Sequence, residues 1–273
     1  MHIPNIRKQF LKEVTMDPIK ILFFDIDGTL VDPATKKISP KTREAIHRLH
    51  EKGFLLCIAT GRVPASLPDF GDLHFDAFCT FNGSVCYNQT ETIYHNPIPP
   101  ESVKKVIENV TALGRPVSIA LRDRLVANGV EKDLADYYGL AGLTLTASED
   151  FEQACQENVY QIMMGCREQD HPAIIQGAKG VKIAVSWDRA VDVISDGGGK
   201  GDGIRKILEY YHLDPSQAVA FGDSYNDIEM LQAVGNSVAM GNAAQALKDI
   251  AAEVCGPVSE DGIYHYCLDR GWI

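Results

Sequence analysis

The chain has 273 residues, of which 45% are hydrophobic and 23% are charged, an ordinary composition for a globular protein with a substantial core. Its formal net charge of -11 argues against a nucleic-acid backbone as the partner, although a metal ion or a lysine can still make one pocket attractive to a small anion. No apolar run reaches the roughly 20 residues of a membrane span, and we expect no membrane partner.

Seven cysteines are present, an odd number, and no two of them form a CxxC pair. Several, such as Cys57 and Cys79, lie in apolar runs. We expect buried free thiols, a reducing compartment and therefore a cytoplasmic protein. Residues 1–18 lack the apolar centre of a signal peptide and are expected to form an extension, either a short amphipathic helix or unstructured.

The first part of the chain alternates predicted strands and helices. Residues 20–27 form a near-continuous apolar run, which predicts a parallel strand covered on both faces. Ser39 and Pro40 predict a helix N-cap followed by proline in the first turn. Further strands are predicted at 54–60 and 76–81.

The last part resumes the same alternation. Helices are predicted at 203–213, 226–235 and 243–253, and strands at 218–221 and 237–240. Strands that alternate with helices imply an α/β fold with a doubly wound, Rossmann-like parallel sheet. We assign residues 19–86 and 193–273 to this core.

The middle of the chain, residues 87–192, is less regular and predicts an inserted α+β cap domain. The expected elements are a helix at 101–114, a hairpin at 117–129, a short helix at 131–139 and strands at 159–165 and 181–187. The boundaries of this second domain are expected near residues 86 and 192.

Polar residues follow the predicted strands of the core. The set comprises Asp25 and Asp27; Thr60, Gly61 and Arg62; Asn82 and Gly83; Asp223, Asn226 and Asp227; and Lys200, which directly precedes a predicted helix. Because ligands of open α/β sheets bind at the carboxyl ends of the strands, we expect these residues to meet at one rim.

This collection suits phosphate chemistry. The four carboxylates of Asp25, Asp27, Asp223 and Asp227 would favour Mg²⁺, which prefers oxygen ligands. Glycines allow backbone N–H groups to approach phosphate oxygens. One carboxylate can attack phosphorus, and a second can deliver a proton to the leaving oxygen.

The motifs DIDGT, TGR, the isolated Lys200 and GDSYND, in this order, resemble those of the haloacid dehalogenase superfamily of phosphotransferases. The TGR, NGS and GDxxND variants, with a large insertion after the third strand, resemble its Cof-type branch of sugar-phosphate and related phosphatases. The resemblance covers residues 19–273. Ser84 departs from the alanine that is frequent in this branch, a change of little consequence because the two residues are similar in size.

The resemblance implies a role for each matching position. Asp25 would be the nucleophile and Asp27 the general acid/base, with its backbone carbonyl on Mg²⁺. Lys200 would restrain Asp25. The phosphoryl group would be held by Thr60 and Lys200, with Gly61, Asn82, Gly83 and Asn226 beside it, and Arg62 close enough to meet the substrate. Asp223 would bind the metal, and Asp227 would support it directly or through water.

The implied activity is Mg²⁺-dependent hydrolysis of small phosphate monoesters through an aspartyl phosphate, with the cap selecting the substrate. Two alternatives stay open: a phosphosugar mutase that uses the same aspartyl phosphate, and a non-catalytic phosphosugar-binding protein. The expected partner is a small phosphorylated metabolite, and the chain would be a monomer or a small homo-oligomer. In the cap, Arg122 and Arg124 either contact the substrate or belong to a solvated hairpin.

Overall fold

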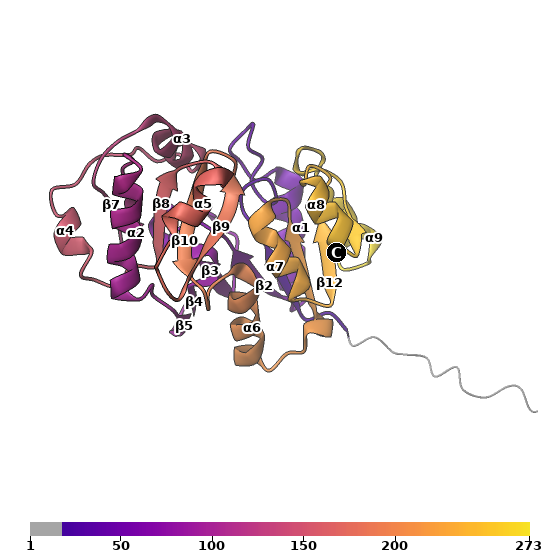
Figure 1. Ribbon diagram of the computed structural model, residues 1–273. Coiled ribbons are helices and arrows are strands. Elements are labelled where there is room, and N and C mark those ends of the chain that lie inside the picture. The colour runs from indigo at the N-terminus through magenta and orange to yellow at the C-terminus, as the bar shows by residue number, and fades with distance from the viewer. Residues whose placement is uncertain (1–17) are drawn as a thin grey trace, which may run out of the picture.

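The computed structural model describes residues 18–273, and it contains two sheets (Figure 1). The larger sheet has eight strands in the order β13-β12-β11-β1-β2-β3-β4-β5. Their bounds are β1 (Ile21–Phe24), β2 (Leu55–Ala59), β3 (Ala77–Thr80), β4 (Val85–Asn88), β5 (Thr92–His95), β11 (Ala218–Gly222), β12 (Asn236–Ala239) and β13 (Glu253–Val254). The strands from β13 to β3 are parallel, and β4 and β5 add an antiparallel hairpin at one edge.

Helices cover both faces of this sheet. Every residue of β1 and β11 is therefore buried. They are α1 (Pro40–Glu51), α6 (Lys200–Tyr211), α7 (Ile228–Gln232), α8 (Gln245–Ile250) and α9 (Gly262–Asp269). Helix α1 packs against α9, and α6 packs against α7. Ser39 caps α1 as predicted, since its side chain accepts a hydrogen bond from the Thr42 N–H.

The smaller sheet is antiparallel, with the order β7-β6-β8-β10-β9. Its strands are β6 (Ser118–Ala120), β7 (Leu125–Ala127), β8 (Gln161–Gly165), β9 (Val181–Trp187) and β10 (Ala190–Ser195). The helices beside it are α2 (Pro100–Ala112), α3 (Lys132–Leu140), α4 (Phe151–Ala154) and α5 (His171–Ile174). We call residues 98–195, which carry this sheet, the cap, and the rest of the described chain the core domain. Figure 1 shows the cap on the left and the core domain on the right.

The two parts share an apolar interface. Val63 and Phe81 of the core domain pack in one cluster with Leu134, Tyr138 and Met163 of the cap. A separate cluster lies within the cap, where α2 packs against α5. The cap in this structure is therefore seated on the core domain rather than held away from it.

The predicted fold class, a parallel α/β core with an inserted cap, is confirmed. The predicted cap boundaries, near 86 and 192, fall inside β4 and β10 instead of between elements. The cause is that β4 and β5 pair with β3 and so extend the larger sheet. We therefore propose that the boundaries lie a few residues further along the chain. The predicted extension at residues 1–18 lies outside the described residues, except for residue 18.

Most other predicted elements are present, but two helices are shorter than expected. The helix expected at 243–253 is α8, Gln245–Ile250. The helix expected at 226–235 is a single 3₁₀ turn, Tyr225–Asp227, followed by α7. All seven cysteines are free thiols, as expected. No helix in residues 18–273 has the length and apolar character required to span a membrane.

Candidate active site

A buried lysine lies between two carboxylates at the carboxyl end of the larger sheet. Lys200 is the first residue of α6 and is only 1% exposed. Its Nζ donates to Asp25 Oδ1 at 2.6 Å and to Asp227 Oδ1 at 2.5 Å. Burial alone would lower the pKa of Lys200, but Asp227 and Asp25 outweigh it and raise that pKa. Lys200 is therefore a fixed positive charge that neutralises part of the surrounding acid.

Asp227 is held on both sides. While Oδ1 accepts from Lys200, Oδ2 accepts from the backbone N–H groups of Asp223 and Ser224, at 2.9 and 3.0 Å. The side chain has no solvent-exposed surface. Asp227 thus fixes the loop after β11 and orients the lysine.

Asp223 lies against the loop that follows β1. Its Oδ1 accepts from the Thr29 hydroxyl at 3.1 Å. A Cβ on Gly28 would lie 2.2 Å from Asp223 Oδ2, and Gly28 has a φ of +88°. Only glycine meets both requirements, so the glycine of DIDGT makes room for this carboxylate.

Asp27 points to a different partner. Both of its oxygens accept from the guanidinium of Arg62, at 2.7 Å from Nε and 2.8 Å from Nη2. Arg62 Nη1 also donates to the carbonyls of Ser66 and, across in the cap, Ala141, at 2.6 and 3.3 Å. Asp27 raises the pKa of Arg62 against the opposing effect of burial.

A chain of hydrogen bonds runs from the loop after β11 into the cap. Asn226 Nδ2 donates to Asn82 Oδ1 at 3.0 Å, and Asn82 Nδ2 donates to Asp192 Oδ2 at 2.9 Å. The Tyr137 hydroxyl donates to the same carboxylate, at 3.0 Å from Oδ2. Asn82 has a φ of +49°, within a turn where Phe81 and Gly83 also have positive φ. The backbone conformation of this turn is strained, and it fixes the position of the Asn82 amide.

Three of the carboxylates form a set that fits a hard cation. Ligand oxygens of Asp25, Asp223 and Asp227 all lie within 4.8 Å of one another. Burial, and after it the neighbouring carboxylates, raise the pKa of Asp223 to about 8. Burial also raises the pKa of Asp25 to about 7, although Lys200 opposes this. A divalent cation would relieve the repulsion among these oxygens, and oxygen donors are what Mg²⁺ prefers.

These residues open into a cavity of about 290 Å³ between the core domain and the cap. Asp25, Asp27 and Asp223 line its floor together with Thr60 and Asn226. Residues of α3, β8 and β9 line the opposite side. A small molecule in this cavity would touch the carboxylates at one end and the cap at the other.

The structure brings most of the predicted site residues together. The residues that line the cavity or contact its lining are Asp25, Asp27, Thr60, Gly61, Arg62, Asn82, Lys200, Asp223, Asn226 and Asp227. Gly83 lies behind them, where a Cβ would be 1.9 Å from the Gly199 carbonyl oxygen, so it serves the close approach of two loops. The Asp27 carboxylate is not in the group of close ligand oxygens, and its predicted backbone contact with a metal stays a prediction.

Arg122 and Arg124 do not line this cavity. Arg122 donates to the Thr92 hydroxyl, and Arg124 pairs with Glu157 at 2.6 Å. Sequence reasoning missed Asp192, which is 1% exposed. Asn242 also supports the site, because its Nδ2 donates to the Gly28 carbonyl at 2.8 Å. A charged residue inside the apolar run AVDVIS was the one available signal for Asp192.

Comparison with known proteins agrees with this geometry. The model of the haloacid dehalogenase-like hydrolase family matches residues 22–267. The chain is 31% identical to the putative phosphatase YkrA of Bacillus subtilis, over 92% of this chain and 98% of that protein. It is 28% identical to the 5-amino-6-(5-phospho-D-ribitylamino)uracil phosphatase YitU of the same organism, over 90% and 95%. The solved structure of the subclass IIB sugar phosphatase BT4131 superposes with a TM-score of 0.87 at 30% identity, over 93% of this chain and all of that one.

The fold, the aspartate-rich rim and the family match together define the class: the chain belongs to the haloacid dehalogenase-like hydrolases. Within that family its named relatives are phosphatases, and this chain is a phosphatase that acts on phosphate monoesters.

Proposed function

We propose that this phosphatase depends on Mg²⁺ and hydrolyses small phosphate monoesters through an aspartyl phosphate on Asp25. The observation that carries the proposal is the buried contact of Lys200 with Asp25 and Asp227 at the floor of the cavity. A lysine in this position holds one oxygen of Asp25 and lowers the repulsion that an incoming phosphate would meet.

Asp25 would act as the nucleophile. Lys200 holds Oδ1, and within the described part of the chain no hydrogen bond is made to Oδ2. Oδ2 would attack phosphorus, forming an O–P bond while the bond from phosphorus to the leaving oxygen breaks. The leaving oxygen would take a proton from Asp27. A water molecule would then give a proton to Asp27 and attack the phosphorus of the aspartyl phosphate, and the bond from phosphorus to Asp25 Oδ2 would break, which releases inorganic phosphate.

The transferring phosphoryl group would be bound by Thr60, Gly61, Asn226 and Lys200. Asn226 is oriented by its bond to Asn82, and the Thr60 Oγ1 accepts from the Arg62 N–H at 3.1 Å. Asp25, Asp223 and Asp227 would hold Mg²⁺, which supplies positive charge to the phosphate oxygens. The cap over the cavity would keep bulk water from the reacting groups.

Asp27 must change its partner during this cycle. In this structure both of its oxygens accept from Arg62, so neither presents a proton to the cavity. We propose that substrate binding moves Arg62 off at least one oxygen, which lets Asp27 serve as the general acid. Because Arg62 also contacts the Ala141 carbonyl, this exchange would accompany a shift of the cap.

The substrate would be a small phosphorylated metabolite, since the cavity has room for little more than one ring beside a phosphate. The names of the relatives point to more than one leaving group, because YitU acts on a ribitylaminouracil phosphate and BT4131 on sugar phosphates. Seven free thiols support an origin in the reducing cytoplasm. We expect a monomer or a small homo-oligomer.

The test is phosphate release from a panel of phosphate esters with Mg²⁺, after removal of divalent ions by EDTA and on their return. We expect activity that is lost with EDTA and restored by Mg²⁺. Asp25→Asn should abolish turnover, whereas Asp196→Asn, an exposed aspartate in the loop after β10, should retain it. Full turnover by Asp25→Asn, or isomer interconversion without phosphate release, would contradict the proposal.

A further inference from the structure

The side of the cavity that faces the carboxylates is aromatic and apolar. The cap contributes Leu125, Tyr137, Tyr138, Leu143, Met163 and Trp187 to it. Among the cap residues that line the cavity in the described chain, none is charged, and Gln161 is the only amide. We call this set, with Gln161, the cap wall.

Two rings of the cap wall are stacked. Tyr137 and Trp187 lie with their planes 10° apart and their centroids at 6.0 Å. The guanidinium of Arg189 lies 4.0 Å from the centroid of the Trp187 ring. Parallel rings that line one cavity form a surface on which a planar ligand can pack.

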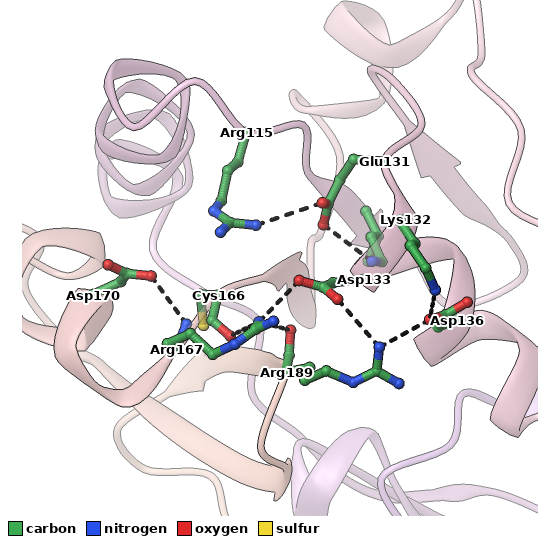
Figure 2. Close-up of polar contacts among 10 residues, drawn as sticks. Arg115, Glu131, Lys132, Asp133, Asp136, Cys166, Arg167, Asp170 and Arg189 are labelled. Atoms are coloured by element: carbon green, nitrogen blue, oxygen red, sulfur yellow. Dashed lines mark hydrogen bonds and ion pairs between the residues drawn. The ribbon is translucent and has the colours of Figure 1, made fainter.

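An ion-pair network lies on the cap beside these rings, and its members do not line the cavity (Figure 2). Arg189 Nη1 contacts Asp136 at 3.0 Å and Asp133 at 3.4 Å, and Arg167 reaches Asp133 at 2.9 Å. Asp133 and Asp136 lie on α3, the helix that also carries Tyr137. The network therefore ties α3 to the turn between β9 and β10, so that the cap wall is preorganised before a ligand arrives.

The polar groups of the cap wall are few and mostly engaged. The Tyr137 hydroxyl donates to Asp192, and the Tyr138 hydroxyl pairs with that of Ser118. Gln161 is itself only 2% exposed, and its Oε1 is buried without a partner in the described chain, so it presents almost no polar surface to a ligand.

These features select against a polyhydroxylated ring. Each hydroxyl of a hexose needs a partner when it is desolvated, and the cap wall offers almost no accessible polar group to serve as one. A planar aromatic ring can instead pack on the stacked rings and needs few polar partners. The cavity volume of about 290 Å³ accommodates such a ring beside a phosphate.

We propose that the leaving group is an alcohol borne on a planar aromatic ring, which packs on Tyr137 and Trp187. This inference rests on the proposed function, because the phosphate of the same molecule occupies the carboxylate end of the cavity. It adds the substrate class and two specificity-determining residues.

The first experiment compares kcat/KM with Mg²⁺ for pyridoxal 5′-phosphate, glucose 6-phosphate and acetyl phosphate. We expect pyridoxal 5′-phosphate to exceed glucose 6-phosphate by about 10-fold, equivalent to some 1.4 kcal/mol, which lies within the range that one stacked ring contributes. A preference for glucose 6-phosphate overturns the inference and leaves the proposed function standing. Failure to hydrolyse all three, acetyl phosphate included, counts against the proposed function instead.

The second experiment uses variants of the cap wall. Trp187→Leu should lower the ratio of kcat/KM for pyridoxal 5′-phosphate to that for acetyl phosphate by about 10-fold, through KM, and Trp187→Phe should restore most of it. Tyr210→Leu, which removes an aromatic ring on α6 that does not line the cavity, should leave it unchanged. Equal ratios in the Trp187→Leu variant and the parent overturn the inference.

Binding gives a readout that does not require turnover. Calorimetry on the Asp25→Asn variant should detect pyridoxine more tightly bound than glucose, and the Trp187→Leu change should weaken pyridoxine binding in that background. Glucose bound as tightly as pyridoxine overturns the inference even when no ester is hydrolysed.

Discussion

Arg62 and Asp27 form a two-bond ion pair in which one guanidinium faces both oxygens of the carboxylate, at 2.7 and 2.8 Å. The third nitrogen of Arg62 reaches the Ala141 carbonyl of the cap. One side chain therefore connects the proposed general acid to the part of the chain that covers the cavity. The position of Asp27 depends on how the cap is seated.

Arg62→Lys tests this connection. Lysine keeps the charge but cannot hold two oxygens and a cap carbonyl together, because it lacks the planar fork of arginine. We expect kcat to fall by about 10²-fold, the lower end of what a positioned acid contributes. Steady-state kinetics on pyridoxal 5′-phosphate provide the measurement. Arg43→Lys, at the exposed pair with Asp72, is the control and should leave kcat unchanged; an unchanged kcat in Arg62→Lys would disprove the connection.

Lys200→Met tests the buried charge cluster. Without Lys200, Asp25 and Asp227 remain buried without a counter-charge, and breaking a buried pair in this way costs about 3–5 kcal/mol. We expect urea unfolding at pH 8 to show this loss, and a smaller loss at pH 5, where burial favours protonated Asp25 because its pKa is raised to about 7. Lys206→Met, which changes a half-exposed lysine of the same helix, should alter stability little. A loss that is equal at the two pH values contradicts the prediction.

Asp192→Asn tests the buried carboxyl of β10. Burial raises the pKa of Asp192 from 3.8 to about 7, although bonds from Tyr137, Asn82 and Gln161 oppose the change. The folded state then binds more protons than the unfolded state between pH 4 and 7, so this group's stabilising contribution is lost as the pH rises through that window.

Asparagine is neutral throughout, so the free energy of unfolding of Asp192→Asn, relative to the parent, should rise between pH 4 and pH 8. One pKa unit corresponds to about 1.4 kcal/mol, and we expect a rise of at least this size. Urea unfolding at both pH values measures it, with Asp196→Asn as an exposed control that should show no such trend. A relative stability that falls with pH would refute the assignment.

Gly28→Ala and Gly53→Ala form a matched pair. Both glycines have positive φ, +88° and +83°, and both alanines should therefore cost about 1–2 kcal/mol. Only at Gly28 would the new Cβ collide with Asp223 Oδ2, whereas nothing lies within 4 Å of the corresponding position at Gly53. We expect Gly28→Ala to raise the Mg²⁺ concentration for half-maximal activity by about 10-fold or more, equivalent to some 1.4 kcal/mol, and Gly53→Ala to leave it unchanged. Similar Mg²⁺ requirements in both variants would contradict the assignment of Asp223 to the metal.

Much of the site follows from a simple rule about strand ends. Parallel strands place their carboxyl ends at one edge, so Asp25, Thr60 and Asp223 could be brought together from the sequence before any coordinates. Lys200 could be added because it is an isolated lysine among glycines just before a predicted helix. These positions depend on local order along the chain, which the sequence carries directly.

The partners of those residues depend on packing that no local pattern encodes. Arg62 was expected beside the substrate, yet its nitrogens are occupied by Asp27, Ser66 and Ala141. Strand β10 was not predicted, because the seven-residue β9 precedes it and only a two-residue turn separates them. The predicted cap boundary near residue 86 falls inside β4 for a related reason: a run of β residues is the same whether it pairs with β3 or begins a second sheet.

The amide of Asn82 is occupied on both sides, by Asn226 at one end and by Asp192 at the other. For anyone who wishes to redirect this phosphatase to another leaving group, that arrangement sets the order of work. Tyr138, Leu143 and Trp187 can be randomised as a library, since they touch the cavity without joining this chain of bonds. Asp192 should be kept, because a change there reaches the phosphate loop through a single side chain.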